Sequence, residues 1–421
     1  MKRFTLGLMM AVALLASCSS DDNNGGGSDN VKGTGVATTT KYLRCVEQVI
    51  DGCNDIANEV GNAKIGDPYD LYVNGNVEDA LYAVESWYSW HSIDDYSNNI
   101  LSIRNAYYGT RDGSVSSKSI SALVKKIDAA LVAKGKSSAF DQEVKDAINK
   151  AYASIQAIPA PFRNNINSSE ARQATVACNE LDETLRDLKA VIQNSGDICT
   201  EESMKEVVDN YVNVVVLPTY ADLKKENTAL NTAIKALAAE MPSGATAAED
   251  FANMDAAKIT KINNLFEKAC DAWLEAREPW ETSEAFLFGP VDALGLDPNM
   301  DSWPLDQKQI MTILTSGKFD QLNWSDGASD DEIEASQGVR GFHTLEFLIF
   351  RNGKARTMSD VADESSSRDV VISASNCASW ANYMVQVANL LQQDATSLDN
   401  AWNVSYENGS SYASKFSAAD F

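Results

Sequence analysis

Apolar residues recur at every third or fourth position along most of the chain from about residue 38 onward. This spacing places them on one face of an α-helix, so it predicts a series of amphipathic helices. Successive apolar stripes begin at Tyr42, Ile93, Phe140, Leu181, Leu223 and Trp380. No succession of short alternating segments, which would indicate strands, interrupts them. The pattern therefore predicts an all-α protein.

Capping and helix-breaking residues suggest where several of these helices begin and end. Gly61 is expected to stop the first helix, and Gly109 the helix that begins near Ser92. Ser92 followed by Asp95 resembles a capping box, which would start that helix. Pro279 is expected either to kink its helix or to begin it anew.

Helices of this length bury their apolar faces best when they pack as bundles. A polar break at Ser195-Gly196-Asp197 divides the series. We therefore predict two four-helix-bundle-like domains, residues 38–200 and residues 201–421.

The first residues resemble a bacterial export signal. Lys2 and Arg3 precede an apolar run, Leu6 to Leu15, that is too short to span a bilayer. Leu15-Ala16-Ser17-Cys18 then matches a lipobox, although a plain cleaved secretory signal is the alternative. We predict a lipoprotein signal peptide at residues 1–17, lipidation of Cys18 and a flexible tether at residues 18–37. The protein is expected in the outer membrane, facing the periplasm or the cell surface and held only by its lipid anchor.

Composition narrows the classes of function. The 421 residues are 44% hydrophobic and 23% charged, as in ordinary globular proteins, and carry a formal charge of −25. This acid excess argues against a nucleic-acid binder, which needs a basic surface. Widely scattered cysteines without metal-binding spacing are predicted to be small core residues, with an occasional disulfide permitted. They are Cys45, Cys53, Cys178, Cys199, Cys270 and Cys377.

The sharpest local motif is Gly341-x-His343-x-x-Glu346. Residues three apart share a helix face, so His343 and Glu346 could bind one metal or share one proton. The alternative is a buried histidine whose hydrogen bond is satisfied by the neighbouring carboxylate. The only other histidine, His91, is predicted to be a helix-end residue and not a ligand. A metal at His343 must then draw on oxygen ligands, which suits iron, manganese or calcium better than zinc.

A second polar constellation comprises Trp273, Arg277, Trp280 and Glu284, which follow one another at offsets of four, three and four. This spacing places them along one helix face. Arg277 and Glu284 could form a buried ion pair between the bundles, or they could line a polar pocket. The sequence has no nucleotide-binding loop and no GxSxG element.

Together these blocks resemble the imelysin family. The resemblance is carried by Pro218-Thr219-Tyr220, by the segment from Trp273 to Pro290, by Trp303-Pro304 and by the GxHxxE element. Blocks that ordinarily follow GxHxxE, among them Glu85-Ser86-Trp87-x-Ser89 and Asn98-Asn99-Ile100, here precede it. We infer a circular permutation with new ends near residues 38 and 421, which a fold tolerates when its original ends lie close together.

The resemblance implies an all-helical fold with a ligand site at the interface of the two bundles. It implies Arg277 as a residue that orients a carboxylate or binds an anionic ligand, and it makes His343 and Glu346 the expected metal ligands. The implied ligand-binding residues are Gly341, His343, Glu346, Arg277, Ser283, Glu284, Ser86, Trp87 and Asn99.

The resemblance also implies a function linked to bacterial iron uptake. The protein is expected to bind iron, another divalent metal, an iron complex or an iron-acquisition protein. One alternative is a metallopeptidase that uses His343 and Glu346, which would need a further ligand and an open metal position. The other alternative is an interaction lipoprotein in which GxHxxE only joins the bundles.

Overall fold

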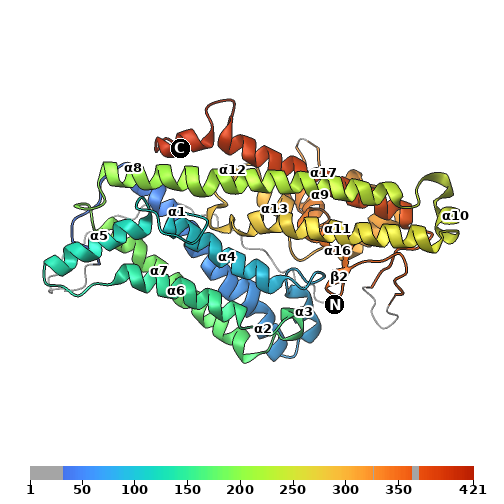
Figure 1. Cartoon of the computed structure of the whole chain (residues 1–421), viewed down its shortest axis with the longest axis horizontal. Helices are drawn as coiled ribbons and strands as arrows, with labels where there is room; N and C mark the ends of the chain where they lie inside the picture. Colours follow the sequence, from blue (N-terminus) through green and yellow to red (C-terminus); the bar gives the residue numbers. More distant parts are fainter. Residues whose placement is uncertain (1–31, 326, 363–368) are drawn as a thin grey trace. The chain divides into compact units, whose positions relative to one another are not determined.

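The computed structural model describes residues 32–325, 327–362 and 369–421 (Figure 1). The predicted signal peptide, Cys18 and most of the predicted tether lie outside the described residues. Nearly all regular structure within the described ranges is helical, so the all-α prediction is confirmed. The strands described there are β1 (Phe350–Arg351) and β2 (Lys354–Ala355), which pair as a short antiparallel hairpin.

The first half of the chain forms one group of packed helices. Its α-helices are α1 (Leu43–Glu59), α2 (Asp67–Val73), α3 (Val77–Ala83), α4 (Ser92–Tyr108), α5 (Ile120–Ala133), α6 (Phe140–Gln156) and α7 (Ser169–Gln193). Helix α7 packs on α1 and α6, and α4 packs on the same two helices (Figure 1). Their buried faces follow the predicted stripes, as with Val144, Ile148 and Ile155 in α6.

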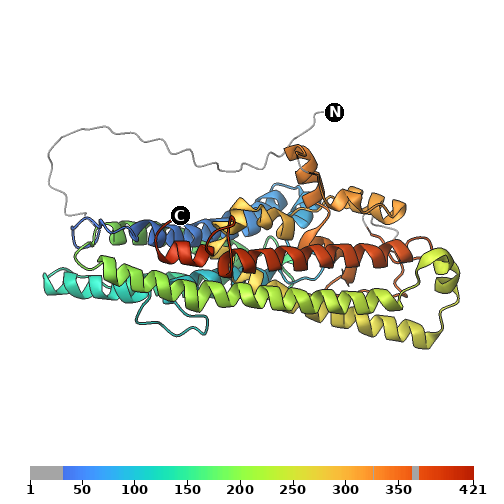
Figure 2. The same ribbon diagram turned by 90° about the horizontal axis from the view of Figure 1, so that it is seen from above.

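The second half forms a group around three long helices, of which α9 lies beside α11 and α17 (Figures 1 and 2). Its α-helices are α8 (Glu201–Asn210), α9 (Leu217–Glu240), α10 (Ala247–Ala252), α11 (Ala256–Glu281), α12 (Pro290–Ala293), α13 (Leu296–Asp301), α14 (Gln307–Ser316), α15 (Asp330–Gln337), α16 (Gly341–Ile349), α17 (Cys377–Asn403) and α18 (Tyr412–Ser417). The shorter helical turns in the described ranges are the π-helices η1 (Val60–Gly66) and η3 (Tyr211–Val216), and the 3-10 turns η2 (Phe162–Asn164), η4 (Gly244–Thr246), η5 (Glu284–Phe286) and η6 (Asp320–Leu322).

The two groups are in contact with each other. Helix α4 packs against α11, and α1 packs against η5. Residues 32–421 form one compact unit, and the division into domains at residue 200 stays a prediction. Within the described ranges, no helix combines the length and the apolar character needed to span a bilayer.

The ends of the described fold lie side by side. The Tyr42 hydroxyl donates to the Ser417 carbonyl at 3.2 Å, and Lys41 Nζ donates to the Ala418 carbonyl at 3.1 Å. A relative whose chain ran continuously through this point would need this proximity. The permuted order of the blocks itself stays a prediction.

The predicted stop at Gly61 is wrong. The helix continues through Gly61 as η1 and then runs directly into α2. Gly61 serves close packing instead, because a Cβ there would lie 2.9 Å from Cβ of Cys178 in α7. A π-helical turn accommodates an extra residue without breaking the helix, and such turns are frequent at functional sites.

The predicted capping box at Ser92 is also wrong. His91 is the N-cap of α4, and the Ser92 hydroxyl instead donates to the Glu85 carbonyl at 2.6 Å. Helix α11 continues through Pro279 to Glu281, so the proline does not begin a new helix. It lies in the last turn, so its missing N–H removes one backbone hydrogen bond near the end of the helix and leaves the preceding turns intact.

Two other expectations are confirmed. Gly109 ends α4 in the left-handed conformation with φ +66°. The six predicted core cysteines are all buried and free of disulfides. Burial raises the pKa of their thiols, as for Cys178 to about 12.

Candidate functional site

The site begins at the first residue of α16. Gly341 has φ +86°, a conformation that residues with a Cβ rarely adopt. A Cβ there would also lie 2.5 Å from the Met300 carbonyl oxygen, so glycine lets α16 approach the end of α13. This approach brings Asp301 next to His343, whose side chain is fully buried.

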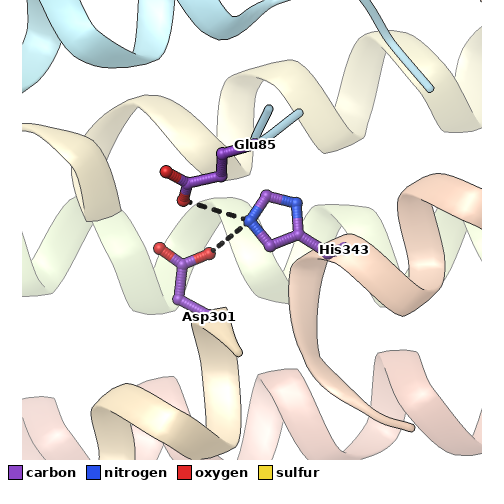
Figure 3. Close-up of side chains that lie close together, drawn as sticks. All are labelled: Glu85, Asp301 and His343. Atoms are coloured by element: carbon purple, nitrogen blue, oxygen red, sulfur yellow. Dashed lines mark hydrogen bonds and ion pairs between the residues drawn. The ribbon is translucent and has the colours of Figure 1, made fainter. Parts of the chain in front are cut away.

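The two ring nitrogens of His343 face different carboxylates. Nδ1 lies 2.9 Å from Oε2 of Glu346, one helical turn further along α16. Nε2 lies 3.1 Å from Oδ1 of Asp301 and 3.2 Å from Oε1 of Glu85, which comes from the first half of the chain (Figure 3). The hydrogen bond fits both the sharing of one proton by His343 and Glu346 and the alternative of a buried histidine that the neighbouring carboxylate satisfies. Joint ligation of one metal by this pair stays a prediction.

Arg277 lies at the centre of the buried carboxylates. Its guanidinium donates to Asp301, and it lies 3.0 Å from Glu85, 3.4 Å from Asp95 and 2.6 Å from Glu281. The same group is 3.4 Å from Nε2 of His343. Arg277 therefore forms buried ion pairs, but not the one hypothesised from the sequence. Its partners there do not include Glu284.

Lys64, in η1, supplies a second buried cation. Its Nζ lies 2.9 Å from Oε2 of Glu85, on the side of that carboxylate away from His343. Burial opposes the ionisation of Glu85, but Lys64 and His343 together lower its pKa to about 2. Arg277 and His343 likewise hold the pKa of Asp301 below its usual value against burial. Burial and Arg277 oppose the charged form of His343, but hydrogen bonds to Asp301 and Glu346 raise its pKa well above the usual range.

A second group of carboxylates lies next to the first. Oxygen atoms of Glu281, Glu284 and Asp301 all lie within 4.8 Å of one another, and Asp301 belongs to both groups. Glu284 is 8% exposed, and its carboxylate accepts no hydrogen bond from the residues that the structure describes. Burial raises the pKa of both Glu281 and Glu284 well above the usual value.

The structure brings several other predicted site residues to this cluster. The Ser86 hydroxyl donates to Asp95, and Asn99 Nδ2 donates to Oε2 of Glu281 at 2.6 Å. Ser283 instead donates to a carbonyl at the end of α11. Trp87 stacks against Tyr82 and carries the Arg163 guanidinium 3.5 Å above its ring. Trp87 directly precedes the backbone amides that bind Glu346 of α16, but its indole packs against Tyr82 and Arg163.

Sequence reasoning missed Lys64, Glu85, Asp95, Glu281 and Asp301 as functional residues. Glu85 and Glu281 stand inside blocks that carried the family resemblance, and Asp301 lies just before Trp303-Pro304. Their position within or next to those blocks was the one sequence feature that could have marked them as site residues. None of these residues has a periodic pattern that marks it as a ligand.

The fold and the site define an all-α protein with a buried centre built from one imidazole and several carboxylates. A search of family models matches imelysin (peptidase M75) over residues 31–188 and 216–420. The chain belongs to the imelysin family.

Two known proteins are similar to this chain. The crystal structure of an imelysin peptidase from Bacteroides ovatus shares 52% sequence identity, with a TM-score of 0.67. The match covers 75% of this chain and 82% of that one. Iron-regulated protein A of Synechococcus elongatus is 29% identical over 146 residues, which are 34% of this chain and 31% of the relative. The chain thus matches about a third of that relative's length.

Proposed function

We propose that this protein binds iron, as cargo, in a bacterial iron-uptake system. The observation that carries the proposal is the meeting of Nε2 of His343 with the carboxylates of Glu85 and Asp301. One imidazole nitrogen among carboxylate oxygens is a donor set that suits iron or manganese. Membership in the imelysin family and the similarity to a protein named iron-regulated support an iron-linked role.

The residues present fit a cation in charge as well as in donor type. Carboxyl groups outnumber the cations Lys64 and Arg277 in the buried cluster, and the Glu284 carboxylate has no hydrogen-bond donor among the described residues. Buried carboxylates need a paired charge or a metal to remain ionised. A bound ion would have to replace the guanidinium of Arg277 at Asp301 and Glu85.

The proposed setting is the outer membrane. The lipobox at Cys18 and the following polar tether support a lipid anchor, with the folded unit in the periplasm or outside the cell. Palmitate labelling of cells that express the chain tests this part. Label in the wild type that disappears in Cys18→Ala is the expected result, and an unlabelled wild type would contradict it.

Metal binding is tested by anaerobic titration of the purified protein with Fe(II), followed by elemental analysis after gel filtration. We expect stoichiometric uptake in the wild type and its loss in the double variant His343→Ala/Asp301→Asn, provided circular dichroism shows that the variant is folded. A wild type that takes up no iron would refute the proposal.

A metallopeptidase is the second candidate, because the relative that shares 52% identity is named an imelysin peptidase. Cleavage of casein that is abolished by a chelator and restored by metal would favour this candidate. Iron uptake without any cleavage would favour the binding function.

A further inference from the structure

We infer that Glu346 is a positioning residue and not a metal ligand. It holds the His343 ring so that Nε2 faces the bound cation. The inference rests on the proposed function, because it concerns how that site holds its metal.

Both oxygens of the Glu346 carboxylate are already engaged, and the side chain is fully buried. Oε2 accepts the hydrogen bond from Nδ1 of His343 at 2.9 Å. Oε1 accepts from the backbone amides of Tyr88 at 3.0 Å and Ser89 at 2.7 Å. Because a carboxylate can only accept, these contacts fix a proton on Nδ1. Nε2 faces the carboxylates of Glu85 and Asp301, so in the metal-free protein it carries a proton as well, and a bound cation would take the place of that Nε2 proton while the Nδ1 proton stays on Glu346.

A strained turn supplies the two amides. Ser86 and Trp90, at φ +51° and +67°, both adopt a left-handed conformation that is uncommon outside glycine. The turn between them is held from outside, because Gly353 donates to the Tyr88 carbonyl at 2.9 Å and Arg163 donates to the Trp87 carbonyl at 3.1 Å. Strained backbone that its surroundings enforce tends to occur at functional sites.

The same turn serves both sides of the imidazole. Glu85, which directly precedes the turn, places a carboxylate at Nε2, and the amides of Tyr88 and Ser89 in the turn fix the carboxylate at Nδ1. A metal-bound histidine commonly donates its other N–H to a carboxylate, which sets the tautomer and the orientation of the ring. Glu346 has this geometry, and Glu85 and Asp301 have that of ligands.

The first experiment compares Glu346→Ala, Glu346→Gln and Asp301→Asn, with Asp394→Asn as the control. Asp394 is also buried and paired, with Arg340, and among the described residues it has no hydrogen bond or ion pair to the site. We expect Glu346→Ala to weaken Fe(II) binding about 10–100-fold. The visible spectrum of Co(II) bound to Glu346→Ala should indicate the same coordination number as in the wild type. Asp301→Asn should change that spectrum, and Asp394→Asn should lower stability without changing affinity.

The second experiment reads the ring directly. The chain has two histidines, so ¹⁵N-histidine labelling gives two imidazole spin systems, and His91→Gln assigns them. With Zn(II) bound, wild-type His343 should show a slowly exchanging proton on Nδ1. Glu346→Ala should lose that signal. A residue that acted only through stability would leave the tautomer unchanged.

The outcomes separate the inference from the proposed function. A wild type that binds neither Fe(II) nor Zn(II) overturns both. If the wild type binds but Glu346→Ala changes the Co(II) coordination as Asp301→Asn does, Glu346 is a ligand and only the inference fails. It also fails if Glu346→Ala binds like Asp394→Asn. Glu346→Gln, which preserves shape, takes the place of the alanine variant if that variant does not fold.

Discussion

Replacing Arg277 by methionine should lower the stability of the metal-free protein and strengthen its binding of a divalent cation. The guanidinium is buried and pairs with Glu85, Asp95, Glu281 and Asp301. Removing one partner from a buried ion pair costs about 3–5 kcal/mol, because the other charge is left without compensation. Uptake of protons by the released carboxylates will offset part of this loss.

The effect on binding follows from competition for the same oxygen atoms. In the wild type a cation at Nε2 of His343 must displace the guanidinium from Asp301 and Glu85. The methionine variant has no such competitor, so its affinity for Fe(II) should rise. Saturating metal should then restore stability, since a ligand at 100 times its dissociation constant adds about 2.7 kcal/mol.

Denaturant unfolding with and without Fe(II), together with titration calorimetry, measures both effects. Arg340→Met is the matched control, because Arg340 is a buried arginine whose side chain pairs with Asp394 of α17 and not with the site carboxylates. It should lose stability that metal does not restore. If Arg277→Met weakened metal binding as much as Asp301→Asn does, the guanidinium would be a support of the site and the competition argument would be wrong.

Three further predictions concern stability and accessibility. Burial raises the pKa of Glu284, so its ionisation opposes folding as pH rises above about 4.5. Glu284→Gln should therefore stabilise the metal-free protein by about 1–3 kcal/mol at pH 7 but not at pH 4. An equal difference in stability between variant and wild type at both pH values would contradict this. Gly341→Ala should cost about 2–5 kcal/mol in urea unfolding, whereas Gly135→Ala, at φ +77° in open space, should cost only about 1–2 kcal/mol. Burial raises the thiol pKa of Cys178 and Cys199 to about 12, so neither should react with Ellman's reagent at pH 8 until denaturant is added. Prompt labelling of either thiol in the folded protein would refute this.

The helices could be predicted from the sequence because helical periodicity is a local signal. The apolar stripe from Phe140 to Ile155 defined α6 almost to the residue. The prediction at Gly61 was wrong because glycine ends a helix in one context and permits close packing in another. Only the position of α7 decides between these two uses.

The site could be predicted only where its partners are local. His343 and Glu346 lie three residues apart, so their hydrogen bond follows from helix geometry. Glu85 is separated from His343 by 258 positions and comes from an irregular turn, where no periodicity marks a side chain as inward-facing. Asp301, at the end of the short helix α13, is placed by the approach of Gly341. Tertiary packing selects both residues.

The buried cluster costs this fold stability, and the cost is consistent with a binding function. Among the described residues Glu284 is buried without a hydrogen-bond donor, and Glu281 and Glu284 lie close enough for each to oppose the ionisation of the other. Ser86 holds an uncommon backbone conformation. A fold selected only to join two bundles would gain by replacing such groups with apolar side chains, because buried ion pairs seldom add net stability. A bound divalent cation would offset this loss of stability, since it would bring positive charge to Asp301, the residue that belongs to both clusters of carboxylates. The arrangement that weakens the empty protein is therefore the one that would stabilise it once the cation binds.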